Sequence, residues 1–464
     1  VCPGIIDSHS HADLTVFREN HAKTLEPLVR QGITTFIGGN CGMSMAPIGK
    51  THFQQASDYI EAFTAMNVEE EIHWRTTAEF FDEIESRPLL MNSAVLAPHG
   101  LVRIHEVGLD ARFAEDSEIK AMQKLVEEAM EAGCIGLSTG LQYFPGSQSD
   151  TRELVELGAA VAKYGGVFTS HLRSYSNTLP QAIDELIEVG RRNEIKTQVS
   201  HIFWVPDSGR LGRPLRALVR GLAWLSDYWT PPVPLDGEVK KQLDKLDRLR
   251  KEGIDVGMDV MPTTTGFTHL LAFFPPWALT GDRDQILARL EDNEMRRRML
   301  RDIVTGKMIW PHVEGNTWSL NLFKVMGWEC VRIMSVVSEK NKKYEGMHLP
   351  VIAKERGQHP FDTACDLLLE EDGRVLIFES MARPEDNFTE RSSFAAIKHP
   401  EVSVSTDTIL MGFGRPSYLF YGCYPKFISR YVRDKKMLDI ETGIRKMTGL
   451  PAQHFNIRDR GTLK

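Results

Sequence analysis

The sequence opens with two histidines in a pattern suited to metal binding. His9 and His11 are separated by one residue and follow the short apolar run at 5–6. In a β-strand, residues i and i+2 point to the same side, so both imidazoles would converge on one point. Imidazole nitrogens are common ligands of divalent cations. An isolated His-x-His pair also occurs in ordinary surface turns, so this pair indicates a metal site only together with further ligands.

Four more residues that can bind a metal follow apolar runs later in the chain. Cys41 lies in a glycine-rich turn after the run 33–39, and glycine permits tight backbone turns. His171 and His201 each follow a serine at the end of an apolar segment, and they are 30 residues apart, about one strand–helix repeat. Asp407 ends the alternating run 402–406. Taken singly, each has an ordinary structural interpretation; the joint pattern favours a metal site.

Short apolar runs alternate with amphipathic stretches along most of the chain. Strands are predicted near 5–11, 33–39, 92–100, 135–140, 167–173, 196–202, 254–260 and 402–407. Helices are predicted at 22–31, 56–65, 78–85, 114–132, 152–164, 180–193, 243–252, 285–304, 349–356, 360–371, 425–433 and 439–447. This alternation is typical of an α/β fold, the (β/α)8 TIM-type barrel, whose active sites lie at the C-terminal ends of the strands. All six candidate ligands fall at such ends.

Two long loop insertions interrupt the alternation within one predicted domain, 1–464. The segment 204–236 combines arginines, Trp224, Trp229 and three prolines, and it is interpreted as a lid over the barrel mouth or an oligomer contact. Contact with a membrane surface is the less favoured alternative. The stretch 263–327 is predicted to be a largely helical excursion. Further strands are predicted at 331–337 and 375–378, and a turn-rich tail at 450–464.

Composition excludes several classes of function. The chain has 464 residues, 42% of them hydrophobic, and a formal net charge of −8, so a nucleic-acid partner is disfavoured. No apolar run approaches the roughly 20 residues that span a bilayer, and the N-terminus lacks a signal-peptide pattern. Six scattered cysteines without a Cys-x-x-Cys pair suit reduced thiols. The expected location is cytoplasmic, with residues expected to be missing before Val1.

The candidate ligands favour hydrolytic zinc chemistry. Imidazoles and a thiolate suit zinc better than magnesium or calcium, which prefer oxygen ligands. A zinc site with an open position lowers the pKa of its bound water to about 7 and polarises a carbonyl, which suits hydrolysis of an amide. Asp407 would take the proton from that water and pass it to the departing nitrogen.

Several segments resemble one known family. The segments are PGIIDSHSH (3–11), GGNCG (38–42), HGLVR (99–103), GLSTGLQY (136–143), SHLR (170–173), VSH (199–201), STD (405–407) and RKMTGLPA (445–452). In this order they resemble the N-acyl-D-amino-acid deacylases (D-aminoacylases) of the amidohydrolase superfamily. The resemblance implies a zinc-dependent hydrolase that cleaves the amide of an N-acyl-D-amino acid, or a related small N-acyl amide, by attack of a metal-bound water.

The resemblance also implies roles for individual residues. His9 and His11 would hold one, weaker zinc position, and Cys41 would join His171 and His201 at the tighter one. Asp407 matches the catalytic aspartate. Three further residues match or lie near substrate-binding positions: Tyr143, Arg173 and Arg415. A planar guanidinium suits the carboxylate of an acyl amino acid.

The chain also departs from the family pattern. Phe203 stands where family members commonly carry a lysine, and Tyr175 where they often have an acidic residue. The late arginine motif is displaced to 414–416, the 204–236 insertion is unusual, and the small β-sandwich of the family is largely absent. Two alternatives stay open: a cyclic-amide hydrolase of the hydantoinase or dihydroorotase kind, and a non-catalytic barrel that binds a ligand.

Overall fold

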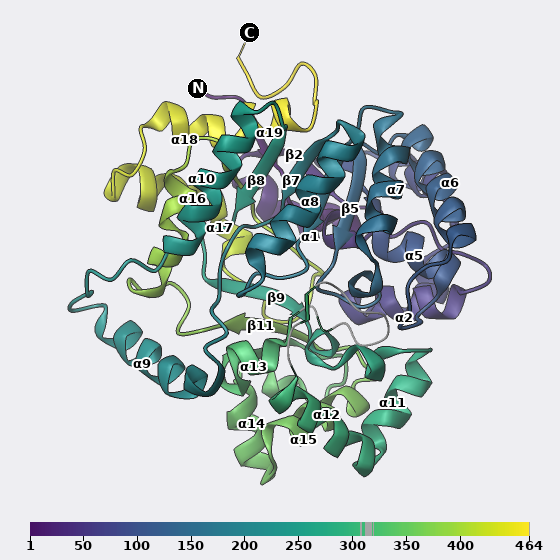
Figure 1. Cartoon of the computed structure of the whole chain (residues 1–464), viewed down its shortest axis with the longest axis vertical. Helices are drawn as coiled ribbons and strands as arrows, with labels where there is room; N and C mark the ends of the chain where they lie inside the picture. Colours follow the sequence, from purple (N-terminus) through teal and green to yellow (C-terminus); the bar gives the residue numbers. More distant parts are fainter. Residues whose placement is uncertain (307–308, 311–317, 319, 464) are drawn as a thin grey trace.

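The predicted strands form parallel sheets in the computed structural model, which describes residues 1–306, 309–310, 318 and 320–463 (Figure 1). Within these residues, one sheet has the order β1-β2-β3 and a second the order β12-β8-β7-β6-β5-β4. The strands are β1 (Ile5–Asp7), β2 (Ile33–Gly38), β3 (Asn92–Val95), β4 (Ala97–Pro98), β5 (Gly136–Gly140), β6 (Val167–His171), β7 (Lys196–Val199), β8 (Val256–Val260) and β12 (Ser403–Val404). The parallel, sequential order agrees with the predicted strand–helix alternation.

Backbone contacts connect the two parallel sheets at both ends. Leu96 separates β3 from β4, and its N–H donates to the carbonyl of Gly38 at 3.0 Å. On the other side, Ser10 and Thr408 form an isolated parallel bridge, and the N–H of Asp407 donates to the carbonyl of His9 at 2.9 Å. The first and last strands of the alternation therefore place their C-terminal ends side by side.

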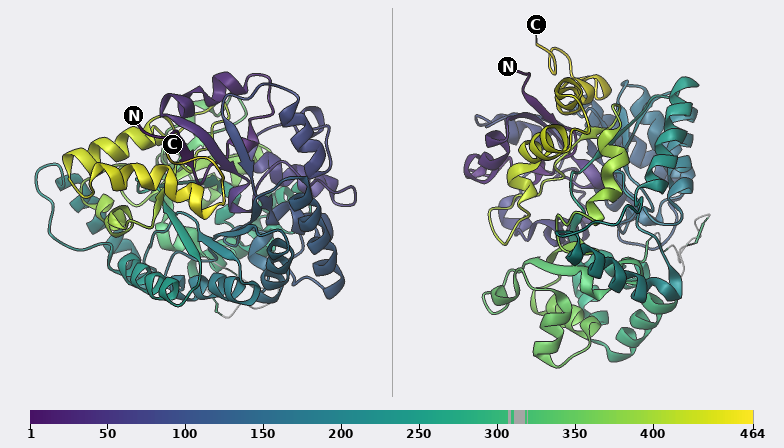
Figure 2. Two further views of the ribbon diagram at one scale, coloured as in Figure 1. Left: turned by 90° about the horizontal axis from the view of Figure 1, so that it is seen from above. Right: turned by 90° about the vertical axis from the view of Figure 1, so that its left-hand side faces the viewer.

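Helices cover the outer faces of the parallel strands, and the two termini lie near one another at one end of the molecule (Figures 1 and 2). These helices are α1 (His21–Arg30), α2 (Phe53–Thr64), α3 (Val68–Glu71), α4 (Thr77–Glu85), α5 (His99–Val107), α6 (Asp116–Ala132), α7 (Thr151–Ala162), α8 (Leu179–Asn193), α10 (Gly237–Lys251), α16 (Phe394–Lys398), α17 (Leu419–Lys426), α18 (Ile440–Met447) and α19 (Gly449–His454). Helix α6 is representative: Ile119, Met122 and Val126 are buried on one face, because residues three and four apart share a helix side.

A second lobe lies below the parallel strands (Figures 1 and 2). Its antiparallel sheet has the order β10-β11-β9, with β9 (Thr265–His269), β10 (Val331–Ser335) and β11 (Leu376–Ser380). Its helices are α11 (Arg283–Glu291), α12 (Asn293–Thr305), α13 (Leu322–Met326), α14 (Leu349–Arg356) and α15 (Pro360–Glu370). The predicted strands at 331–337 and 375–378 belong to this sheet.

Much of the excursion 263–327 is helical, as predicted: it holds α11, α12 and α13. It also holds a strand at 265–269 that pairs with β11, and its residues 307–308, 311–317 and 319 lie outside the described part. Three other details of the predicted secondary structure were wrong. The helix predicted at 285–304 is divided into two helices at Asp292. The side chain of Asp292 accepts hydrogen bonds from the backbone N–H groups of Glu294 and Met295 and so caps the start of the second helix. The strand predicted at 92–100 ends at Pro98, because α5 begins at His99. The tail predicted at 450–464 contains most of α19.

The insertion 204–236 contains a helix that the sequence did not predict, α9 (Gly212–Leu225), which projects to one side of the molecule (Figure 1). Its outer surface exposes Leu218 to 56% and Trp224 to 66%. The predicted oligomer contact at this segment and the predicted cytoplasmic location stay predictions. Within the described residues, the helices are all too short or too polar to cross a membrane.

A buried ion cluster joins two of the strand–helix units and yields a stability prediction. The carboxylate of Glu153 on α7 pairs with Arg103 and, at 2.7 Å, with His99, both on α5. Glu153→Gln leaves the Arg103 charge buried without a full partner, so we expect the free energy of unfolding to fall by about 3–5 kcal/mol in urea denaturation. The exposed neighbour Glu156 on the same helix provides the control Glu156→Gln, with an expected change of about 0.5 kcal/mol or less. Equal effects of the two substitutions would contradict this account.

The same cluster has a pH signature. Burial raises the pKa of Glu153, but the charges of Arg103 and His99 outweigh burial and lower it to about 2, below the ordinary 4.5. Because the pKa of the folded state is the lower one, the stabilisation is complete above pH 4.5 and is lost as the pH falls toward 2. Unfolding curves of the wild type and Glu153→Gln should therefore converge in acid.

Candidate metal centre

Four imidazoles, one thiol and one carboxylate meet at the C-terminal ends of the parallel strands. Cys41 Sγ lies 3.3 Å from His9 Nε2, 3.6 Å from His171 Nδ1 and 3.7 Å from His201 Nε2. Asp407 Oδ1 lies 3.3 Å from His9 Nε2 and 3.2 Å from His11 Nε2. The donor atoms form two overlapping groups that share the sulfur: His9, His11, Cys41 and Asp407, and Cys41, His171 and His201.

The spacing of these atoms fits a small cation. Ligands about 2.0–2.3 Å from a tetrahedral zinc ion are separated from one another by roughly 3.3–3.8 Å. The two longer Cys41 distances, 3.6 and 3.7 Å, fall in that range. Nitrogen and sulfur donors suit zinc and other soft or borderline metals, whereas magnesium and calcium prefer oxygen. The donor set therefore fits a zinc centre with two adjacent positions.

Three of these residues have a strained backbone conformation. Cys41, His201 and Asp407 have φ values of +55°, +32° and +48°, a left-handed region that residues other than glycine rarely adopt. Each of these three residues contributes a donor atom to the cluster. At Gly39, φ is +75° and an added Cβ would lie 2.1 Å from the carbonyl oxygen of Leu96. Only glycine fits there, which explains the glycine before the Cys41 turn.

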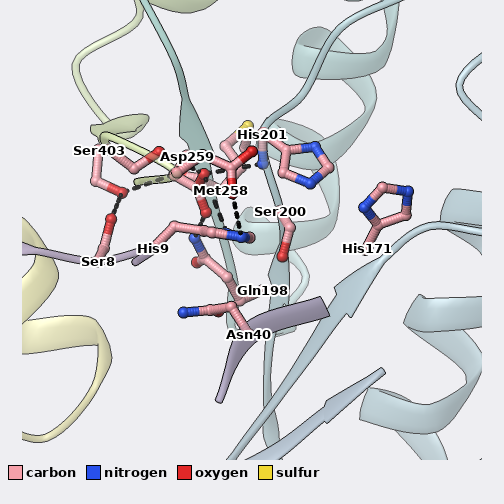
Figure 3. Close-up of polar contacts among 12 residues, drawn as sticks. Ser8, His9, Asn40, His171, Gln198, Ser200, His201, Met258, Asp259 and Ser403 are labelled. Atoms are coloured by element: carbon pink, nitrogen blue, oxygen red, sulfur yellow. Dashed lines mark hydrogen bonds and ion pairs between the residues drawn. The ribbon is translucent and has the colours of Figure 1, made fainter. Parts of the chain in front are cut away.

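Asp259, at the end of β8, lies beside the His9 imidazole and binds the backbone that presents His201 (Figure 3). Its carboxylate accepts hydrogen bonds from the backbone N–H of His201 at 2.9 Å, from Gln198 Nε2 at 2.7 Å and from Ser405 Oγ at 2.8 Å. Its Oδ1 also lies 3.8 Å from His9 Nδ1. A carboxylate on the Nδ1 side favours the orientation of the His9 imidazole in which Nε2 faces the metal site. Sequence reasoning missed Asp259, although its place at a strand end was a usable signal.

The electrostatics of the cluster favour ionised sulfur and oxygen. Burial raises the pKa of the Cys41 thiol, but the charge of His9 and hydrogen bonds from His11 and His171 outweigh burial and hold it well below the ordinary value. Burial also raises the pKa of Asp407, and His9 and His11 reverse that shift. A thiolate and a carboxylate are the forms that bind a cation.

The three predicted substrate-binding residues occupy different environments. The Tyr143 ring is buried, packs against His171 with ring centres 4.7 Å apart, and lines a cavity of about 40 Å³ at the cluster. Arg173 is also buried, and its guanidinium binds Glu185 at 2.9 Å and the Ser147 carbonyl at 3.0 Å. Arg415 lies on an exposed loop. The structure therefore brings Tyr143 to the cluster, while Arg173 and Arg415 lie outside the lining of this cavity.

Glu379, on β11 of the second lobe, also reaches this cavity. Its Oε2 is buried without a hydrogen-bond partner among the described residues, and burial raises its pKa to about 7. Sequence reasoning missed Glu379 because nothing in the pattern indicates that β11 approaches the ends of the parallel strands.

Comparison with known proteins identifies the family. No protein-family model matches the chain. The chain is 25% identical over 476 residues to D-aminoacylase of Alcaligenes xylosoxydans xylosoxydans, a match that covers the whole chain and 75% of that protein. It is 31% identical over 466 residues to N-acyl-D-aspartate deacylase of the same organism, covering the whole chain and 73% of that protein. The chain belongs to the N-acyl-D-amino-acid deacylase family.

Solved structures agree with this family at the level of the fold. The crystal structure of a D-aminoacylase matches with a TM-score of 0.70 at 22% identity, over the whole chain and 76% of that structure. An N-acyl-D-glutamate deacylase from Bordetella bronchiseptica, in complex with zinc and a phosphonate inhibitor, matches with a TM-score of 0.69 at 23% identity over the same shares of the two chains. The deacylase fold thus spans the chain from end to end.

Cys41 provides the test of the shared metal centre. We expect Cys41→Ala to lose bound metal from both positions, because the sulfur belongs to both donor groups. The measurement is the metal-to-protein ratio by plasma mass spectrometry after dialysis against zinc. Cys365→Ala, which removes a buried thiol on α15, should retain the wild-type ratio. An unchanged ratio in Cys41→Ala would exclude the sulfur as a ligand.

Proposed function

We propose that this chain is a zinc-dependent amidohydrolase that cleaves the amide of N-acyl-D-amino acids or related small N-acyl amides. The observation that carries the proposal is the convergence of four imidazoles, Cys41 and Asp407 at one point. The family supports the reaction class, and the similar N-acyl-D-glutamate deacylase was crystallised with zinc and a mimic of the tetrahedral intermediate.

We assign His9 and His11 to one zinc position and Cys41, His171 and His201 to the other. Zinc bound there would polarise the scissile carbonyl and make water acidic enough to react near neutral pH. Asp407 would accept a proton from the attacking water and deliver it to the leaving nitrogen, because a carboxylate at this place can serve as base and then as acid.

The substrate contacts follow from the positions of the side chains. Tyr143 faces the donor cluster, so its phenol is placed to contact a bound substrate. Arg173 acts through the turn at 146–149, since its guanidinium binds the carbonyls of Ser147 and Ser149; we therefore assign it to positioning rather than to direct contact. A substrate role for Arg415 stays a prediction from the family resemblance.

A proposal about the closure of the barrel accompanies the proposed function. We infer that the eight parallel segments, with β3 and β4 as one, close into a (β/α)8 barrel, and that residues 1–464 form one hydrolase domain. The Ser10–Thr408 bridge and the bond from the Asp407 N–H to the His9 carbonyl support closure between the first and last strands.

Two other functions remain distinguishable by assay. A cyclic-amide hydrolase would use the same zinc chemistry on ring substrates, so hydantoins and dihydroorotate belong in the same assay. A ligand-binding barrel without catalysis is disfavoured, because all six expected donors are present and close together.

Asp407→Asn tests the proton-transfer role. An amide is not a general base, so we expect kcat to fall by roughly 10²–10⁴-fold, with bound zinc largely retained because His9 and His11 remain. The measurement is the steady-state rate of zinc-loaded enzyme beside its metal content. Loss of the metal together with the rate would assign Asp407 to metal binding instead, and full activity would exclude the proposed role.

A matched panel of N-acyl-D- and N-acyl-L-amino acids tests the substrate assignment. We expect hydrolysis that a chelator inhibits and that is faster for the N-acyl-D-amino acids, because the family acts on the D configuration. If the zinc-loaded enzyme cleaves neither the D nor the L substrates but opens the ring of hydantoins, the cyclic-amide hydrolase replaces the proposed function.

A further inference from the structure

A second, larger cavity lies directly beside the candidate metal centre. Its volume is about 480 Å³, roughly three times that of an apolar cavity of about 150 Å³ that holds benzene. It adjoins the small cavity at the donor cluster, because the same residues line both: His201, Phe203, Met261, Gly266 and Glu379. This space greatly exceeds what an acetyl group needs.

Apolar side chains form most of its walls. At the inner end, Phe203 stacks on Tyr175 with ring centres 4.3 Å apart and planes within 10°. Helix α13 contributes Val325 and Met326, which are buried. Helix α9 covers the opposite side with Leu215 and Val219. The insertion and the second lobe therefore build a hydrophobic chamber at the metal centre, as is typical of sites for apolar ligands.

The charged groups on the lining are unsuited to a second carboxylate. The Arg216 guanidinium is already engaged by Glu329 at 3.5 Å and by the carbonyl of Val325 at 3.3 Å. Glu238 accepts a hydrogen bond from Gln242 at 2.6 Å. Glu379, at the junction with the small cavity, adds a carboxyl group and no positive charge. The described lining thus favours an uncharged, apolar group.

We propose that this cavity binds a long or bulky apolar chain of the substrate while the scissile amide lies at the Cys41–Asp407 cluster. The inference rests on the proposed hydrolase function and narrows its substrates to N-acyl amino acids with a medium or long aliphatic acyl group or a large apolar side chain. Each methylene that the cavity buries should raise binding by roughly fourfold.

The first experiment compares three substrates on zinc-loaded wild-type enzyme: N-acetyl-D-alanine, N-octanoyl-D-alanine and N-acetyl-D-tryptophan. We expect kcat/KM for the octanoyl or the tryptophan compound to exceed that for N-acetyl-D-alanine by at least tenfold. Preference for the octanoyl compound assigns the cavity to the acyl group, and preference for the tryptophan compound assigns it to the side chain. Values within about threefold of one another for all three would overturn the inference.

A matched pair of substitutions on α9 tests the location. Val219→Trp places an indole in the cavity, so kcat/KM for the preferred bulky substrate should fall at least tenfold while that for N-acetyl-D-alanine stays within twofold. Leu218→Trp changes the exposed neighbour and should leave both values unchanged. Equal losses for the large and small substrates in Val219→Trp, with a native circular dichroism spectrum, would overturn the location.

A direct binding measurement on the wild-type protein tests the cavity without relying on catalysis or on the folding of a variant. By calorimetry, octanoate should bind wild-type zinc-loaded protein at least tenfold more tightly than acetate, and octanamide more tightly than acetamide. If the protein binds the long probes in this way but hydrolyses no acyl amino acid, the proposed hydrolase function is wrong and the assignment of the apolar cavity is retained. Equal affinities for the long and short probes, together with no preference for the tryptophan substrate, would overturn the cavity assignment.

Discussion

One buried sulfur organises the site. The thiolate of Cys41 is withdrawn from water, and a buried anion is tolerated only when positive partners compensate for its lost hydration. The imidazoles of His9, His171 and His201 approach it within 3.3–3.7 Å. They come from three different strands, so the sulfur can be surrounded only if those strands end at the same level. The metal chemistry proposed for this chain therefore depends on the register of the parallel strands.

A buried hydrogen-bond network maintains that register. The Asp7 carboxylate, on β1, accepts hydrogen bonds from the Thr406 N–H at 3.0 Å and from the Tyr424 hydroxyl at 3.1 Å, which connects the first strand to the segment that carries Asp407. Asp259 connects β8 to the His201 backbone in the same way. These bonds hold the left-handed backbone at His201 and Asp407 in place, because strained conformations persist only when their surroundings over-determine them.

Reaction chemistry and substrate choice come from different parts of the chain. The parallel strands carry the donor cluster, whereas the walls of the neighbouring apolar cavity include α9, α13 and the segments 202–208 and 261–266, which follow β7 and β8. Insertions can change these cavity walls without moving the metal-binding residues, because the insertions are attached to loops at the strand ends. This division accounts for a chain that keeps every expected donor and yet has Phe203 and Tyr175 stacked beside them.

The sequence alone determined the parallel alternation and the six donors, because the spacing of apolar runs sets the strands and parallel strands end on one side. It did not reveal the burial of Arg173, whose partner Glu185 lies on the following helix, or the strand at 265–269, whose partner β11 is more than 100 residues away. Asp259, Glu379 and the α9 wall likewise acquired their roles through contacts between distant segments. Such contacts depend on how the elements pack, and local periodicity carries no information about packing; only the tertiary structure decided them.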